Sequence, residues 1–329
     1  MKIQISDLRQ LILSSLRKKY AEEDAQSMTE VLLFGQLSGK TSHGIVRLFV
    51  GNSSILSQNP TSKPQITTQS ELSSIITGYG NPGMLVGQIA VKEVIQIAKK
   101  KGIGLVGTNG TNTSSGCLSY YLEKIALENL IGIIMAQSPP STPAYGGIEP
   151  LFGTNPISFG IPSKPRPLIF DMATSAISFG AMLKAKTLNQ KLPDNVAIDK
   201  HGNPTTDPEE AMKGATLPFD NSYKGAGLAM MVEILSGLWT GADFSGLNNK
   251  GGWGNLFIAF NPKIFMSENE FKDKVSLLLE KMRSSKTKTG EKVRIPGERT
   301  LDTRDASLKC GWIEIEDHLF QELQNTGVK

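Results

Sequence analysis

The sequence predicts an α/β fold preceded by a helical N-terminal part, and three observations lead to this prediction. Apolar residues recur at the spacing of amphipathic helices through residues 6–20 and again through 22–38. From about residue 71, short apolar runs typical of strands alternate with longer helical patterns. The string Gly102 to Gly107 matches G-x-G-x-x-G, but a helical pattern precedes it and a strand-like run lies within it. A dinucleotide fingerprint needs a strand first and a helix after, so this string does not indicate a Rossmann unit.

Length and composition bound the class of protein. The chain has 329 residues, enough for two parts, which we place at 1–70, joined by 300–329, and at 71–299. Its 35 basic and 31 acidic residues interleave and leave a net charge of +4, which fits a small anionic substrate and does not favour nucleic-acid binding. The two cysteines form no C-x-x-C pair, so neither a disulfide framework nor a zinc site is indicated. The N-terminus does not resemble a signal peptide and no apolar run reaches membrane length, so we expect a cytoplasmic protein without membrane contact.

The N-terminal part is expected to consist of two helices and an irregular segment. Ser6 or Asp7 can cap the first helix. The apolar stripe of the second helix, residues 22–38, supplies side chains to the core or to a dimer interface. A polar stretch with two prolines, from Asn52 to Ser70, is interpreted as a linker or irregular arm.

The α/β part is expected to begin with a strand at 73–77 and a glycine-rich turn. The helix after this turn is expected to end at three lysines and Gly102. Cations stabilise the negative end of a helix dipole, and glycine readily adopts the left-handed conformation that follows a helix. A long loop at 141–156 and a turn-rich excursion at 193–209 interrupt the pattern. The other expected elements are strands at 103–106, 131–136, 157–161, 167–172 and 312–315, and helices at 86–101, 117–129, 172–188, 225–239, 268–283 and 316–325.

The segment from Gly39 to Leu48 holds the strongest candidate for chemistry. If Ser42 caps a short helix, His43 and Arg47 lie one turn apart on one face, at about 5–6 Å between Cβ atoms. Arg47 could then bind the carboxylate of a 2-hydroxy or 2-oxo acid, while His43 exchanges a proton with the neighbouring oxygen. The alternative is a histidine in a turn at a solvated helix start. The other two histidines, His201 and His318, are expected at the surface.

Three further segments admit both a functional and a structural interpretation. Residues 113–116 precede a helix and could form an anion cradle or an ordinary cap. Lys224 at a helix start opposes the dipole unless an anion is bound there, but it could equally be solvated. The basic stretch 281–294 is expected to be a solvated loop, with a rim for cofactor phosphates as the second interpretation.

Seven sequence blocks in order resemble a known family, and together they run from about residue 4 to 320. The blocks are SHGIVRL (42–48), GIGLVGTNGT (102–111), GGIEPLFGTNPISFGIP (146–162), FDMATSAISFG (170–180), IDKHGNPTTDP (198–208), YKGAGLAMMVEILSG (223–237) and RIPGE (294–298). They are similar to the malate/L-lactate dehydrogenase-like family of the second, non-Rossmann type. Ureidoglycolate dehydrogenase-like members look most similar.

The resemblance implies an NAD(P)-dependent oxidoreductase acting on small 2-hydroxy or 2-oxo acids, with NAD slightly favoured. It implies a mixed or antiparallel central sheet that carries the cofactor in the part at 71–299, flanked by helices, and a homodimer. His43 would exchange the proton and Arg47 would bind the carboxylate, with Ser42, Ser114, Thr154 and Asn155 near the substrate. The resemblance places the dinucleotide at Leu168, Phe170, Asp171, Met172, Ala173, Thr174, Ser175, Tyr223, Lys224, Gly297, Glu298 and Arg299.

Two positions depart from the family pattern. Relatives carry a histidine where this chain has Ser114, and a tyrosine where it has Gly51. Both groups would face substrate, so the substrate itself does not follow from the resemblance. Two other functions therefore stay open: reduction of a cyclic imino acid such as piperideine- or pyrroline-2-carboxylate, and cofactor binding with weak or lost turnover.

Overall fold

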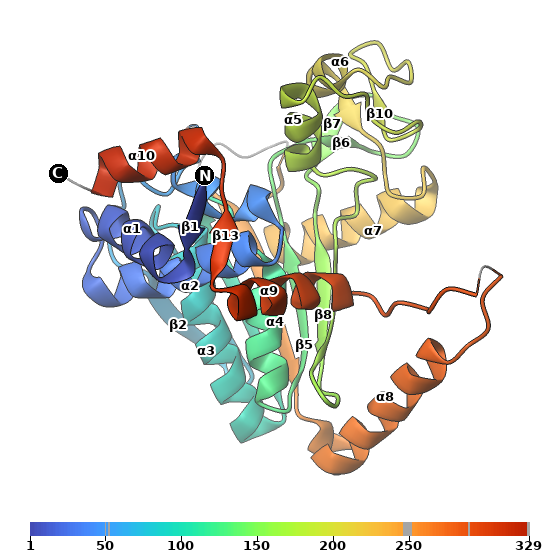
Figure 1. Cartoon of the computed structure of the whole chain (residues 1–329). Coiled ribbons are helices and arrows are strands. Elements are labelled where there is room, and N and C mark those ends of the chain that lie inside the picture. The colour runs from blue at the N-terminus through green and yellow to red at the C-terminus, as the bar shows by residue number, and fades with distance from the viewer. Residues whose placement is uncertain (50, 52, 246–251, 289, 328–329) are drawn as a thin grey trace.

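A seven-stranded mixed sheet forms the centre of the protein (Figure 1). The computed structural model describes residues 1–49, 51, 53–245, 252–288 and 290–327. The strands follow the order β2-β3-β4-β12-β5-β8-β9, and β3 with β4 is the one parallel pair among them. Their bounds are β2 Gln65–Ser70, β3 Ser73–Thr77, β4 Ile103–Thr111, β12 Trp253–Phe260, β5 Ile131–Ala136, β8 Ile157–Ile161 and β9 Leu168–Met172. The prediction of a mixed, largely antiparallel, non-Rossmann sheet is confirmed.

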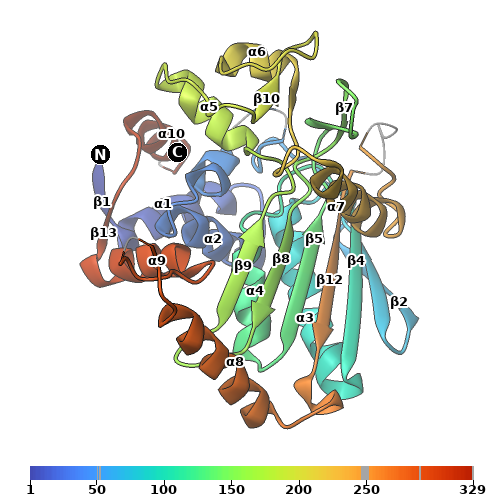
Figure 2. The ribbon, with the colours of Figure 1, turned by 90° about the vertical axis from the view of Figure 1, so that its right-hand side faces the viewer.

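Helices α3 (Gly83–Lys101) and α4 (Leu118–Leu127) cover one face of this sheet (Figure 2). Tyr121 of α4 and Phe257 of β12 meet edge to face at 5.7 Å between ring centroids, and both are fully buried. Helices α1 (Ile5–Arg17) and α2 (Glu22–Leu37) extend the same core outward. Leu8, Ile12 and Leu16 of α1 are fully buried, as the helical spacing predicted.

The end of the chain returns to its beginning. Strand β13 (Trp312–Glu314) pairs antiparallel with β1 (Lys2–Gln4), and α10 (Asp317–Gly327) packs against α1. Helix α9 (Glu298–Cys310) precedes β13 and contacts α2. Strands β1 and β13 therefore lie side by side in Figure 1.

Two small units lie beyond the sheet. The short strands β6 (Thr142–Pro143) and β7 (Pro150–Phe152) form a hairpin, and a second unit follows it in the chain (Figure 1). That unit contains α5 (Phe179–Thr187), β10 (Ala197–Ile198), α6 (Pro208–Lys213) and β11 (Ala215–Thr216). Helix α7 (Tyr223–Glu233) leads back to the sheet and continues as a π-helical turn, Ile234–Leu238. Helix α8 (Glu268–Arg283) follows the last central strand.

Several sequence-based assignments were wrong or incomplete. The stretch interpreted as an arm from Asn52 to Ser70 contains edge strand β2, although Asn52 itself lies outside the described residues. The sequence analysis omitted β12, the strand between β4 and β5, and also α9. The loop at 141–156 contains β6 and β7. The basic stretch 281–294 includes Thr289, which also lies outside the described residues.

The helix expected from Met172–Ser175 begins instead at Phe179. Ser175 forms a β-bridge with Pro218, and this extended pairing replaces the expected first turn. The Oγ atom of Ser178 accepts a hydrogen bond from Ala181 N, so Ser178 is the N-cap of the shorter helix.

Candidate active site

Two 3₁₀ turns, Thr41–His43 and Ile45–Leu48, form the segment that carries the strongest candidates. The expected helix capped by Ser42 is wrong, because Gly44 separates the turns and neither turn has a side-chain cap. A Cβ on Gly44 would lie 2.4 Å from Gln36 Oε1 and 3.1 Å from the Gln36 backbone, so a side chain there would have to displace Gln36 of α2. Ile45 and Leu48 are fully buried and fix the second turn in the core.

The predicted residues nevertheless lie together. Ser42 Oγ lies 3.0 Å from His43 Nδ1, and Arg47 Nε donates a 2.7 Å hydrogen bond to the Ser42 carbonyl oxygen. Both Nη groups of Arg47 lack a hydrogen-bond partner among the described residues, so this end of the guanidinium can bind a carboxylate with two parallel bonds.

Packing and charge keep His43 neutral. Removal of water from the ring, together with the nearby Arg47 and Lys40 charges, lowers the pKa of His43 to about 3, against the opposing effect of Asp171. A neutral imidazole can accept a proton. In the tautomer whose Nδ1 donates to Ser42, the lone pair of Nε2 is free for this role.

A buried ion pair joins this segment to the edge strand of the sheet. Lys40 Nζ lies 2.6 Å from Asp171 Oδ2, and Ser119 and Ser158 donate further hydrogen bonds to the same carboxylate. Burial alone would raise the pKa of Asp171, but the Lys40 charge and these hydrogen bonds hold it below its usual value. The charge of Asp171 also acts on His43. The carboxylate of Asp171, expected to bind cofactor, is thus occupied within the protein.

The sequence analysis assigned no role to Lys40, which the structure brings into the candidate site. The signal was an aspartate inside the apolar run Leu168 to Met172, since a buried carboxylate requires a cationic partner. Nothing in the sequence indicates which lysine is that partner.

Thr174, which follows β9, is hydrogen-bonded to Thr154 and Asn155, two residues predicted to lie near the substrate. Thr174 N and Thr174 Oγ1 both donate to the carbonyl oxygen of Thr154, at 2.9 and 3.1 Å. Asn155 is fully buried with φ +36°, and its Nδ2 donates a 2.6 Å hydrogen bond to Glu233 Oε2 of α7. The Oδ1 atom of Asn155 is buried without a partner in the described structure. A buried unpaired acceptor of this kind is costly, so it is a candidate ligand contact.

The predicted cofactor residues meet along β9 and its extension. Gly297 has φ +86°, and a Cβ there would lie 1.7 Å from the Ile169 carbonyl oxygen, which brings the start of α9 against β9. At the other end of the segment, Phe219 N donates to Thr174 O, and this bond places the start of α7, with Tyr223 and Lys224, near the same chain. Glu298 pairs with Arg283 and accepts from Ile295 N, so its carboxylate is occupied.

The remaining candidates differ in their surroundings. Leu168, Phe170, Met172 and Ala173 are half-buried, and Phe170 stacks on Phe159 at 6.3 Å between centroids. Lys224 and Arg299 are exposed and form no ion pair among the described residues. Ser175 is buried and donates from its Oγ atom to Ile177 O.

Ser114 lies apart from the histidine segment in its contacts. Its Oγ accepts from Gly116 N at 3.1 Å, and no hydrogen bond in the described part of the chain joins it to His43 or Arg47. Neighbouring Thr113 accepts from Gly83 N at the start of α3, while Cys117 is the N-cap of α4 and makes no side-chain cap bond. Ordinary capping of α4 by Ser or Thr is therefore absent.

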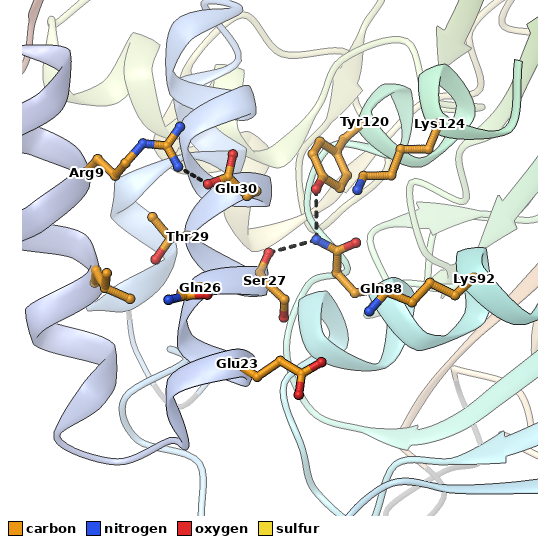
Figure 3. A pocket seen from close by; sticks show the side chains of 11 residues that line it. Arg9, Glu23, Gln26, Ser27, Thr29, Glu30, Gln88, Lys92, Tyr120 and Lys124 are labelled. Atoms are coloured by element: carbon orange, nitrogen blue, oxygen red, sulfur yellow. Dashed lines mark hydrogen bonds and ion pairs between the residues drawn. The ribbon is translucent and has the colours of Figure 1, made fainter. Parts of the chain in front are cut away.

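A hollow of about 490 Å³ is a separate feature (Figure 3). It lies between α1, α2, α3 and α4, and none of the predicted site residues lines it. Gln88 donates at 2.8 Å to Ser27 O and Tyr120 OH at its base, and Arg9 pairs with Glu30 at its rim.

Neither a membrane span nor a metal cluster is found in the part of the chain that the structure describes. No described helix combines the length and apolar character needed to cross a bilayer. No group of three or more described His, Cys, Asp or Glu side chains could hold a metal ion.

The mixed, non-Rossmann sheet is the fold of solved dehydrogenases that the chain resembles along almost its whole length. The chain belongs to the malate/L-lactate dehydrogenase family, whose family model matches residues 3–324.

Individual relatives match along most of their length. L-sulfolactate dehydrogenase of Methanocaldococcus jannaschii is 35% identical over 325 residues, covering 96% of this chain and 93% of that protein. Its solved structure covers 99% of this chain and 96% of its own, with a TM-score of 0.87. Ureidoglycolate dehydrogenase (NAD(+)) of Escherichia coli O157:H7 is 32% identical, covering 98% and 95%. Delta(1)-pyrroline-2-carboxylate reductase 1 of Burkholderia ambifaria is 33% identical, covering 91% and 89%.

Proposed function

We propose that the protein transfers a hydride between a nicotinamide dinucleotide and C2 of a small 2-hydroxy or 2-oxo acid. The observation that carries this proposal is the junction of His43, Arg47 and the Lys40–Asp171 pair beside β9. Relatives that are 32–35% identical over 91–98% of this chain are named for sulfolactate, ureidoglycolate and pyrroline-carboxylate reactions. Two of these names refer to hydroxy acids and one to a cyclic imino acid, so they support hydride transfer at C2 of a small acid rather than one particular substrate.

The residues present fit a bound dinucleotide. Lys224 and Arg299 are exposed cations without ion-pair partners among the described residues. These cations suit phosphate groups, and Asn155 Oδ1 is an unpaired buried acceptor near Thr174. The segment from Leu168 to Ser175 connects these points. When bound, the dinucleotide supplies or accepts the hydride.

The protein's own part is to hold the acid and move one proton. Arg47 binds the substrate carboxylate through its two Nη groups, and its Nε bond to Ser42 O fixes the guanidinium plane. Neutral His43 takes the proton from the C2 hydroxyl during oxidation and returns it during reduction. Lys40 holds Asp171 beside His43, where the carboxylate stabilises the imidazolium that forms.

The cyclic imino acid remains a second candidate, because a relative that is 33% identical over 310 residues is named as a pyrroline-2-carboxylate reductase. The same hydride geometry then acts on C=N instead of C=O.

We further propose that the chain has two parts, one formed by 1–70 with 300–329 and the other by 71–299. We also propose that the protein is a homodimer, that it favours NAD slightly over NADP, and that it acts in the cytoplasm. Both cysteines are free, which suits a reducing compartment.

The experiment is oxidation of NADH and NADPH by the purified protein with a panel of acids. The panel contains oxaloacetate, pyruvate, a sulfonated pyruvate, oxalurate and a cyclic imino acid. Turnover of an oxo acid supports the main proposal, and turnover of the imino acid alone selects the second. Arg47→Lys should raise KM for the preferred acid about 10- to 100-fold, because it loses the paired Nη contact, while the affinity for the reduced cofactor stays unchanged. Binding of reduced cofactor without turnover on any acid would contradict both proposals for this panel.

A further inference from the structure

The hollow between helices α1, α2, α3 and α4 has the size and lining of a ligand site. Its volume is about 490 Å³, and pockets that hold small molecules measure roughly 300–1,000 Å³. Polar and charged side chains from all four helices surround it in Figure 3. None of the predicted site residues is among them, so the proposed reaction does not use this chemistry. We call this feature the helix hollow.

Two buried polar side chains form the base of the helix hollow. Gln88 is 4% exposed and Tyr120 is 8% exposed. The Gln88 amide donates both of its hydrogens, to Ser27 O and to Tyr120 OH, each at 2.8 Å. Among the described residues, nothing donates to Gln88 Oε1 and nothing accepts the hydroxyl hydrogen of Tyr120. The base therefore offers a ligand one free acceptor and one free donor.

Two lysines extend towards this base from neighbouring helices (Figure 3). Lys92 lies one turn after Gln88 on α3, and Lys124 lies one turn after Tyr120 on α4. The Nζ atom of Lys124 is 4.9 Å from the centroid of the Tyr120 ring. Neither lysine forms an ion pair within the described ranges of the chain. Two unpaired ammonium groups beside a hydroxyl donor suit the oxygens of a carboxylate.

The remaining charges leave this base positive. Arg9 and Glu30 pair with each other at the rim, so their charges cancel. Glu23 is exposed, and it is the one lining acid without an ion pair among the residues described. Figure 3 shows Glu23 away from Tyr120 and Lys124. The two free lysines thus outweigh one distant carboxylate, which favours an anionic ligand at the base.

We propose that the helix hollow binds a small polycarboxylate that also carries a hydroxyl group. The carboxylates accept hydrogen bonds from Lys92, Lys124 and the Tyr120 hydroxyl, and the ligand's own hydroxyl donates to Gln88 Oε1. An anion made only of acceptors, such as sulfate, would bring an oxygen against this unpaired amide oxygen. The free acceptor therefore selects a hydroxy acid over a simple inorganic anion.

Helix α4 connects the helix hollow to the candidate active site. Ser119, the neighbour of Tyr120, donates a 2.7 Å hydrogen bond to Asp171 Oδ2, and the same oxygen pairs with Lys40. A ligand on Tyr120 and Lys124 therefore contacts the helix that supports this ion pair. We expect occupation of the hollow to change turnover. Only this effect rests on the proposed function, because binding at the hollow does not depend on it.

Isothermal titration calorimetry with citrate tests the binding. Citrate is a tricarboxylate with one hydroxyl group, and tricarballylate is the same tricarboxylate without it. We expect citrate to bind the wild type with millimolar or tighter affinity, and tricarballylate to bind about 3- to 10-fold more weakly, since Gln88 Oε1 then lacks a donor. Lys124→Met should weaken citrate binding about tenfold or more, because it removes a charge-assisted hydrogen bond. Tyr120→Phe keeps the ring and should also weaken citrate binding.

Two control variants locate the bound citrate. Lys100→Met should bind like the wild type, because Lys100 is an exposed lysine of α3 that does not line the hollow. Arg47→Lys should also retain citrate binding, because Arg47 belongs to the candidate active site and not to the hollow. Circular dichroism and thermal unfolding verify that each variant is folded.

Three results would overturn the binding site. They are no binding of citrate to the wild type, unchanged binding by Lys124→Met, and sulfate binding as tightly as citrate. Loss of binding in Arg47→Lys alone would place citrate in the active site and would equally overturn it. The effect on turnover is measured separately, as kcat/KM for the preferred acid with and without citrate. A change in the wild type that Lys124→Met lacks supports the link through α4, and an unchanged wild type overturns that link.

Discussion

Lys40 and Asp171 form a 2.6 Å ion pair between residues 131 positions apart in the sequence. Their side chains are 29% and 13% exposed, so water screens the pair only in part. This contact joins the histidine segment to β9, whose extension bonds Thr154 and Asn155 through Thr174 and whose Ile169 lies against Gly297. The pair therefore acts as the anchor of the site.

Removal of one partner of this pair should destabilise the protein more than replacement of both partners. We expect Lys40→Met to lower the free energy of unfolding by about 2–4 kcal/mol, since it leaves Asp171 buried and unpaired. The double variant Lys40→Met with Asp171→Asn should regain part of that loss. Chemical denaturation of the two single variants and the double variant gives the coupling energy. Additive losses would show that the pair is unimportant to stability.

The low pKa of His43 predicts an unusual pH dependence. For oxidation of the hydroxy acid, the neutral base is the active form, so kcat/KM should stay level from pH 8 down to about pH 5 and fall only near pH 3. An ordinary histidine would lose activity below about pH 6.5. The profile is interpretable only where circular dichroism shows the protein folded. A midpoint near 6.5 would contradict the packing-induced shift.

The same shift affects stability. His43 binds a proton in the unfolded chain near pH 6.5 but in the folded protein only near pH 3. The unfolded state therefore binds more protons between these values, and stability falls as the pH drops through this window. His43→Asn should reduce that dependence, whereas His318→Asn, at an exposed site, should leave it unchanged.

Ser114 should influence which acid is used. If it replaces a histidine that contacts substrate, Ser114→His will change the relative kcat/KM values across the panel and leave the affinity for reduced cofactor as it is. Ser285→His, on an exposed loop after α8, is the control. An unchanged order of substrates would place position 114 outside the substrate pocket.

Gly297 tests the cofactor side of the site. Gly297→Ala introduces a Cβ at 1.7 Å from the Ile169 carbonyl oxygen and forces α9 away from β9. We expect weaker binding of NADH or NADPH and a loss of stability beyond the ~1–2 kcal/mol of the left-handed conformation. Gly311→Ala is the matched control, since Gly311 ends the same helix with φ +76° and open space around it. Equal effects of the two variants would show that the close approach of Gly297 to Ile169 does not cause the loss.

Periodicity predicted the amphipathic elements well, and tertiary pairing explains what it missed. The strand Ser73–Thr77 and the helix Glu268–Arg283 have the bounds expected from sequence. Strand β12 is buried on its central residues, so it has no alternation to detect, and its signal was an apolar run between Gly252 and Asn261. The β-bridge of Ser175 with Pro218 depends on a contact distant in sequence, which local propensity does not contain.

The candidate site was predictable in its residue types and unpredictable in its geometry. His43 and Arg47 lie together as expected, but through two 3₁₀ turns around Gly44 rather than along one helix face. The reason is the close packing of Gly44 on Gln36, which only the fold reveals. Lys40 was missed because its partner, Asp171, lies on β9, far from it in the sequence.

The central claim is that His43 moves the proton at C2, and one comparison tests it most directly. Turnover of the preferred acid by the wild type and by His43→Ala would be measured alongside binding of the reduced cofactor to both proteins. We predict a loss of about 10²–10⁴-fold in kcat with cofactor affinity unchanged, and His201→Ala behaving as the wild type. A His43→Ala protein that binds cofactor and retains wild-type kcat would contradict the account.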